Sequence, residues 1–278
     1  MNPQRNVMRL QVIIPVINLW KKYTKPCLDS VLKCTEGLIY PYRVLLIDNG
    51  SSDETREEMT KYIGTLVGYM RFEQPNSFSQ SVNIGIRDGI QRGFTHFLVL
   101  NNDVLLNKNT VSDLLKRFIN SSETENLAIA TPLNIKDQTT PEGTYEFSTE
   151  TKTECIERES PDFSAFMISR EAFERVGEFD EGFEKAYHED NDYHYRIRLL
   201  GMKAICLLTA YYYHFGSRTQ NEACSTPIVT GSQFEKNRNY YIAKWGGDHD
   251  GNRETFKQPF NDSEKDVTWT KQRDNQSN

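Results

Sequence analysis

The sequence predicts an α/β protein with a mostly parallel central sheet flanked by helices. Two observations carry this prediction. Short, nearly continuous apolar segments alternate with amphipathic segments of helical periodicity, and polar, turn-forming clusters directly follow several of the apolar segments. The chain of 278 residues has a length that suits a single compact unit with a large core. Ligands of such sheets bind at the carboxyl ends of the strands, where these polar clusters lie.

The first half of the chain supplies most of the predicted sheet. Apolar runs predict buried strands at Gln11–Val16, Arg43–Ile47, Met70–Phe72 and His96–Leu100. Helix-start signals and apolar stripes predict helices capped by Thr24, by Ser51 in a capping box with Glu54, and by Thr110, with a further helix over Ser79–Arg92.

The pattern changes after about Thr131. Residues 136–161 are polar and predict loops or weak edge strands, and Phe163–Ile168 predicts a strand. Helices are expected over Arg170–Val176 and Asp190–Leu200, and two strands around a turn over Ala204–Leu208 and Ala210–His214. We therefore predict one compact unit with two subregions, 1–131 and 132–246, and a polar, flexible tail over 247–278.

Composition excludes several classes of protein. The net charge of −6 and the pI near 5.5 provide no overall positive field for nucleic acid, although a local basic groove stays open. No apolar run approaches the roughly 18–20 residues that span a bilayer. The five cysteines contain no Cys-x-x-Cys pair, which argues against a disulfide framework or zinc knuckle and favours a reducing, cytoplasmic location.

Two polar clusters follow predicted strands. Asp48 begins a turn in which its carboxylate could accept from a nucleobase, although a strand-to-helix turn with an Asp or Ser cap explains the same residues. Asn101-Asn102-Asp103 follows another strand and could hold a hard divalent cation that bridges phosphates, or could be an ordinary polar turn.

Two further clusters lie in the second half. His188-Glu189-Asp190-Asn191-Asp192 places three carboxylates at the start of a helix, more than capping needs, so their mutual repulsion favours a cation or a proton-transfer role. His214 ends an aromatic strand just before Arg218. This histidine is either structural or part of a metal and diphosphate site.

Together these stretches resemble a GT-A fold glycosyltransferase of the inverting, soluble, non-processive family 2 type. The resemblance runs from about Leu10 to Gly247. The matching segments read VIIPV at 12–16, LLIDNGSSDET at 45–55, NSFSQSVNIGI at 76–86, FLVLNNDV at 97–104, FSAFMISREAFERVGEFDEGF at 163–183, HEDNDYHYRIRLLG at 188–201, HFGSRT at 214–219 and NRNYYIAKWGG at 237–247.

The resemblance implies that 1–131 is the nucleotide-sugar-binding half and 132–246 the acceptor-binding and catalytic half. It also implies a role for each matching residue. Donor-binding positions are Pro15 and Val16 along the nucleoside, Asp48 at the base, Asn76 and Asn83 on the nucleotide side, and Asn101, Asn102 and Arg218 nearer the diphosphate. Asp103 matches the last residue of the family's Asp-x-Asp metal motif, and His214 matches a histidine that can ligate Mn²⁺ or Mg²⁺. Asp190 matches the general base, with Glu189 beside it.

One position departs from the family pattern. Asn101 replaces the first aspartate of Asp-x-Asp, which removes one negative charge and predicts weaker metal binding or more reliance on His214. The Gln-x-x-Arg-Trp motif of processive synthases is missing, so transfer of a single sugar is expected. The donor is expected to be a UDP-sugar, with dTDP- and GDP-sugars left open. The acceptor could be a glycan, lipid-linked glycan, protein, small molecule or modified DNA base, and a homo-oligomer stays open.

Two alternatives belong to other classes. One is a non-catalytic module that binds sugar nucleotides or glycans. Asn101, in place of the first aspartate of Asp-x-Asp, leaves this alternative open. A nucleotidyltransferase would want a glycine-rich loop after the first strand, and residues 16–22 contain no glycine.

Overall fold

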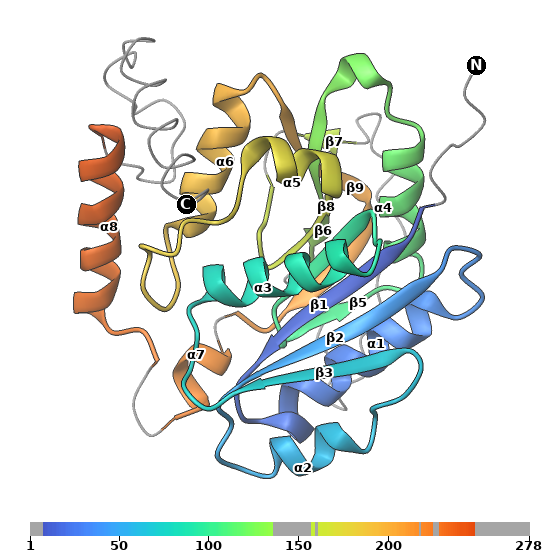
Figure 1. Ribbon diagram of the computed structural model, residues 1–278, viewed down its shortest axis with the longest axis vertical. Coiled ribbons are helices and arrows are strands. Elements are labelled where there is room, and N and C mark those ends of the chain that lie inside the picture. Colours follow the sequence, from blue (N-terminus) through green and yellow to red (C-terminus); the bar gives the residue numbers. More distant parts are fainter. Residues whose placement is uncertain (1–7, 136–156, 159–160, 217, 225–227, 248–278) are drawn as a thin grey trace.

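A computed structural model describes residues 8–135, 157–158, 161–216, 218–224 and 228–247 (Figure 1). Its strands are β1 Leu10–Val16, β2 Tyr42–Asn49, β3 Val67–Phe72, β4 His96–Leu100, β5 Val104–Leu106, β6 Leu127–Asn134, β7 Glu157–Arg158, β8 Ala165–Ser169 and β9 Lys203–His214. A π-helical turn over Trp20–Thr24 leads into α1 Lys25–Thr35. The other helices are α2 Thr55–Thr60, α3 Phe78–Gln91, α4 Thr110–Ile119, a 3₁₀ turn Glu123–Glu125, α5 Arg170–Val176, α6 Glu189–Leu199, α7 Arg218–Glu222 and α8 Gly231–Trp245.

The described strands form one sheet in the order β3-β2-β1-β4-β8-β6-β9-β5, with β7 paired to β9. The predicted parallel unit is β3, β2, β1 and β4, in which Val16 pairs with Asp48 and Asn49 with Phe72. The carboxyl ends of these strands therefore meet at one edge. Beyond β4 the pairing is mixed, because β8 runs antiparallel to both β4 and β6, and β9 runs parallel to β6.

Alternating side chains give the sheet two apolar faces. Val12 and Ile14 of β1 join the core beneath α1 and α4, whereas Ile13 joins the core beneath α3, α5 and α6. Figure 1 shows α3 and α5 lying over one face of the sheet and α1 on the other. The predicted α/β architecture with helices on both faces is confirmed.

Two of the three predicted helix caps are wrong, and the third residue makes no capping hydrogen bond. Ser51 Oγ accepts from Asn18 N, and the short α2 begins only at Thr55. Thr110 Oγ1 donates to the carbonyl of Tyr211, and the N-cap position of α4 is taken by Asn109. Thr24 does occupy the N-cap position of α1, but its Oγ1 accepts from Asn102 Nδ2 and not from a helix N–H. Ser77 and Gln80 form a capping box at the start of α3. This helix begins at Phe78, one residue before the predicted start at Ser79.

The second half holds further corrections. Ala204–Leu208 and Ala210–His214 belong to one continuous strand, β9, whose pairing with β6 shifts register between Pro132 and Leu133 instead of turning. Strands β5 and β6 and helices α7 and α8 were not among the predicted elements. Within the predicted loop 136–161, the two-residue β7 pairs with β9, in line with a weak edge strand; residues 136–156 and 159–160 lie outside the described residues.

Helix α8 packs against α6 at the outer edge of the molecule (Figure 1). Trp245 Nε1 donates to Asp192 Oδ1 at 2.8 Å, and Lys244 Nζ lies 2.6 Å from both Asp180 Oδ2 and Asp192 Oδ1. These ion pairs are buried, since the side chains of Lys244 and Asp192 are 4% and 0% exposed. The carboxylate of Asp192 thus joins two helices.

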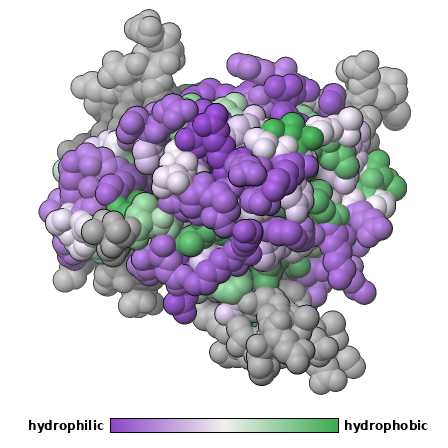
Figure 2. Space-filling model, turned by 90° about the horizontal axis from the view of Figure 1, so that it is seen from below, coloured by the Kyte–Doolittle hydropathy of each residue, from purple (hydrophilic) through white to green (hydrophobic). Residues whose placement is uncertain are grey.

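The predicted division at residue 131 falls within β6, and the sheet continues across it. Those domain boundaries stay a prediction, and the predicted tail lies outside the described residues from 248 onward. None of the described helices is both long and apolar enough to cross a membrane. The face seen in Figure 2 is largely hydrophilic, with apolar residues in small, separate patches.

Candidate active site

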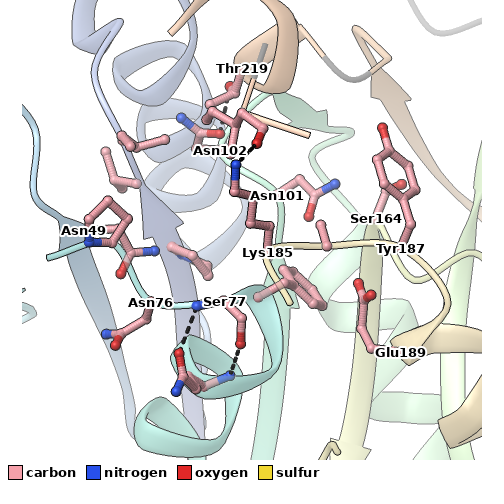
Figure 3. Close-up of a pocket in the computed structure, with 18 of the residues that line it drawn as sticks. Asn49, Asn76, Ser77, Asn101, Asn102, Ser164, Lys185, Tyr187, Glu189 and Thr219 are labelled. Atoms are coloured by element: carbon pink, nitrogen blue, oxygen red, sulfur yellow. Dashed lines mark hydrogen bonds between the residues drawn. The ribbon is translucent and has the colours of Figure 1, made fainter. Parts of the chain in front are cut away.

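A pocket of about 710 Å³ opens at the carboxyl edge of the parallel strands. One side is formed by the loop after β2 and the start of α3, and the other by the loop before α6. Figure 3 shows Asn49, Asn76 and Ser77 on the first side and Tyr187 and Glu189 on the second. Of the predicted site residues, the pocket lining includes Pro15, Val16, Asn76, Asn101, Asn102, Asp103, Glu189, Asp190 and His214.

Asp103 and His214 come together although they are distant in sequence. Val104 pairs with His214 in the β5–β9 ladder, which places Asp103 Oδ1 3.2 Å from His214 Nε2. Asp103 Oδ2 accepts from the backbone N of Arg218 at 3.0 Å. The side chain of Arg218 is not part of the pocket lining and pairs with Glu222 at 3.4 Å.

The two asparagines before Asp103 have different surroundings. Asn101 lines the pocket, and its backbone N donates to Ser164 O at 2.9 Å. Asn102 also borders the pocket, but its amide is held on both sides. Nδ2 donates to Thr24 Oγ1 at 2.9 Å. Oδ1 accepts from Thr219 Oγ1, also at 2.9 Å (Figure 3). Asn102 therefore braces the loop that presents Asp103.

The pair Asp103 and His214 fits a divalent cation by its donor chemistry. A carboxylate oxygen and an imidazole nitrogen are both ligands of Mn²⁺, and the adjacent Asn101 offers an amide oxygen. The described part of the chain holds no group of three or more His, Cys, Asp or Glu residues placed to bind a metal. Any metal bound here would therefore complete its coordination with substrate oxygens and water.

Asp48 is fully buried and does not line the pocket. Its carboxylate accepts from Arg71, from Tyr69 Oη at 3.2 Å and from Ser51 N at 2.8 Å. In this structure Asp48 thus holds together β3 and the turn after β2. A base that bonded this carboxylate would have to share it with three donors already in place.

Asn76 and Asn83 have different surroundings, because only Asn76 borders the pocket. Asn76 borders the pocket, and its Nδ2 is buried with no hydrogen-bond partner among the described residues. Such a donor suits a ligand oxygen. Asn83 lies deeper: Nδ2 donates to Phe179 O at 2.8 Å and Oδ1 accepts from Phe179 N at 2.8 Å, which fixes the chain before α6.

The three acidic residues at the start of α6 occupy three environments. Asp190 lines the pocket, and its Oδ1 accepts from Asn191 N at 2.8 Å. Glu189 is only 6% exposed, and its Oε2 has no partner among the described residues. Burial, with the nearby charges of Asp190 and Asp192, raises the pKa of Glu189 well above its usual range, which favours the protonated, neutral form of this carboxyl. Asp192 faces away from the pocket into its ion pairs with Arg196 and Lys244.

Several lining residues were not predicted from the sequence: Asn49, Ser77, Ser164, Glu181, Lys185 and Tyr187. Asn49 and Ser164 adjoin predicted strands, so their position at a strand end was an available signal. Lys185 and Tyr187 lie in a loop without periodicity, and only the tertiary fold brings them to the pocket.

The fold and pocket agree with what the comparisons with known proteins find. The family model "Glycosyl transferase family 2" matches residues 11–177, and the chain belongs to this family. The expected GT-A fold and glycosyltransferase class are therefore confirmed. A search of curated proteins finds no match.

Solved structures share the fold at low sequence identity. The structure of GalNAc-T7 with UDP, GalNAc and Mn²⁺ matches with a TM-score of 0.63 and 16% identity, covering 96% of this chain. S. aureus TarS 1-349 in complex with UDP matches with a TM-score of 0.56 and 19% identity, covering 94% of this chain and 70% of that one. This chain spans 55% of the length of the GalNAc-T7 chain.

Proposed function

We propose that the protein transfers one sugar from a UDP-sugar to an acceptor hydroxyl with inversion, using Asp190 as general base. The observation that carries the proposal is the pocket itself. Asp103 and His214 lie 3.2 Å apart among its lining residues, and Asp190 comes from a different element, at the start of α6. UDP in the solved TarS and GalNAc-T7 complexes, and Mn²⁺ in the latter, support this choice of donor and metal.

Each part of the reaction has a residue suited to it. Asp103 and His214 would hold a divalent cation, which when bound offsets the charge that grows on the departing diphosphate. The Nδ2 donor of Asn76 and the oxygen of Asn101 suit the nucleotide side of the donor. Asp190 accepts the proton from the attacking hydroxyl, and attack on the face opposite the diphosphate inverts the anomeric centre.

Burial favours the protonated form of Glu189, which suits this residue to a different role from that of Asp190. As a protonated acid it can donate a hydrogen bond to a sugar or acceptor oxygen, which an ionised carboxylate cannot do. Its neighbour Asp190 stays available to accept a proton. Two adjacent carboxyls in different environments can thus act as donor and acceptor in one pocket.

Replacing Asp190 tests the proposal directly. Asp190→Asn keeps the shape but removes the proton acceptor, so UDP binding should persist while transfer falls by roughly 10²–10⁴-fold. The measurements are UDP release from a panel of UDP-sugars and the melting temperature of the variant. If Asp190 only caps α6, Asn would serve nearly as well, and unchanged turnover would remove Asp190 from the mechanism.

A further inference from the structure

The loop between α5 and α6, residues 177–188, contains residues with unfavourable backbone angles. It supplies Lys185 and Tyr187 to the pocket and leads directly into Glu189 and Asp190. Lys185, Tyr187 and His188 have φ angles of 59°, 80° and 72°. Residues with a Cβ rarely adopt this region, and a run of three within four residues persists only where the surroundings hold it.

One side chain contacts this strained segment at several points. Asn237 of α8 is 1% exposed, and its Nδ2 donates to the carbonyls of Glu184, Ala186 and Tyr187 at 2.9, 2.9 and 3.0 Å. Its Oδ1 accepts from Glu184 N at 3.1 Å. A single amide thus binds the backbone on both sides of Lys185 and up to the residue before His188.

The other side of the loop is held by α3. Phe78 N, in the first turn of that helix, donates to Lys185 O at 2.7 Å. The loop is therefore fixed between α3, which borders the proposed nucleotide side, and α8, which lies beyond the family match at 11–177. The contacts of Asn237 reach the pocket through the backbone of its lining residues 184–187, which leads on to Glu189 and Asp190.

We propose that Asn237 is a positioning residue that holds the 184–188 backbone and thereby aims Glu189 and Asp190 at the substrate. This inference rests on the proposed function. Amide chemistry is required, because the position must donate two N–H bonds, shared among three backbone carbonyls, and also accept from the backbone N–H of Glu184. An aspartate of the same shape would only accept, and would set its charge against three carbonyl oxygens.

The test compares Asn237→Ala and Asn237→Asp with the wild-type chain at 15 °C. Both variants should lower the kcat of UDP release, with water as the acceptor, from the UDP-sugar that the wild-type chain turns over fastest, by about 10²-fold, the scale of a misaligned catalytic group. The Kd for UDP with Mn²⁺ should change less than about two-fold, because the nucleotide-side residues Asn76 and Asn101 belong to other segments than the changed loop. Hydrogen–deuterium exchange of the 184–192 amides should rise, with exchange in β1–β4 unchanged.

Asn239→Ala is the matched control, since it removes an exposed asparagine from the same helix and should change none of these quantities. Asp190→Asn is measured in parallel. If it abolishes UDP release while the Asn237 variants remain active, the positioning role is wrong and the proposed function stands. If Asp190→Asn is fully active, the proposed function fails instead. Unchanged exchange at 184–192, or Asn237 variants that are unfolded at 15 °C, would also overturn the positioning role.

Discussion

The side chains at the start of α6 show how burial separates the roles of neighbouring carboxyls. Asp192 pairs with Arg196 and Lys244, accepts from the indole of Trp245, and fastens α6 to α8. Glu189 is buried with an oxygen that meets no partner among the described residues, and burial raises its pKa. Asp190, between them, lines the pocket. Sequence spacing alone groups all three as one acidic cluster, because it carries no information on which of them is desolvated or paired.

The raised pKa of Glu189 makes stability depend on pH. In the unfolded chain this carboxyl ionises near its ordinary pKa of about 4.3, whereas burial raises its pKa in the folded chain. The folded state therefore binds the proton more tightly, and stability falls as the pH rises from about 4.3 toward the folded pKa. Glu189→Gln, which is always neutral, should remove this loss, so its melting temperature relative to wild type should rise between pH 5 and pH 8.

The control for this prediction is Glu171→Gln on α5, whose side chain is 83% exposed. Its melting temperature should follow that of wild type at every pH. A Glu189→Gln curve parallel to wild type would show that Glu189 is already ionised in the folded protein.

Prediction of a residue's role from the sequence fails where a polar side chain hydrogen-bonds to a segment that is distant in the sequence. Ser51, Thr24 and Thr110 have the residue types of helix caps, yet each hydroxyl bonds a distant segment. Helix capping is a local pattern that sequence spacing can suggest, whereas these bonds exist only after the sheet has formed. Asn237 is similar, since nothing local marks an asparagine whose partners lie about 50 residues earlier.

At the scale of the element, α3 depends on two glycines that let it approach the sheet closely. A Cβ on Gly85 would lie 2.6 Å from Ile13 Cγ2, and one on Gly89 would lie 2.5 Å from Phe97 Cε1. Both neighbours are fully buried, so neither can move aside easily. Helix α3 also opens with the Ser77–Gln80 capping box beside the pocket, so its distance from the sheet helps to set the pocket's shape.

Gly85→Ala should therefore destabilise the protein despite alanine's better helix propensity. Overpacking a core typically costs about 1–3 kcal/mol, and only about 1 kcal/mol is regained from propensity. The measurement is the free energy of unfolding in urea. Gly64→Ala is the control, because a Cβ there meets nothing within 4 Å and the change should be nearly neutral. A Gly85→Ala variant as stable as wild type would mean that α3 can shift on the sheet without loss.

At the scale of the whole molecule, donor binding should appear as stabilisation that depends on the metal. A ligand at about 100 times its Kd adds about 2.7 kcal/mol to the free energy of unfolding. UDP with Mn²⁺ should raise the melting temperature of wild type, and UDP in excess chelator should raise it less. Asp103→Asn, which removes the carboxylate 3.2 Å from His214, should lose the Mn²⁺-dependent part. An equal shift with and without metal would exclude this role for Asp103.

The sequence predicts the parallel half of the sheet well and the mixed half poorly, for a physical reason. Strands β1, β2 and β4 are buried on both faces, so they read as continuous apolar runs. Strand β9 alternates less regularly and contains a register shift, so one strand reads as two. The candidate site follows the same division: strand-end residues such as Asp103 are found by position, whereas the loop residues Lys185 and Tyr187 are not.

The sheet order also governs how the chain can fold while it is being synthesised. Strand β4 pairs with β8, and Asp103 meets His214, which lies 111 positions later in the sequence. At translation rates of about 5–20 residues per second, the chain from Asp103 to His214 takes roughly 6–22 s to produce. Strand β8 emerges part-way through this interval, and until then β4 has one open edge, which favours wrong pairing with other chains. The nascent protein therefore has a period in which this strand edge is unprotected and Asp103 lacks its partner His214.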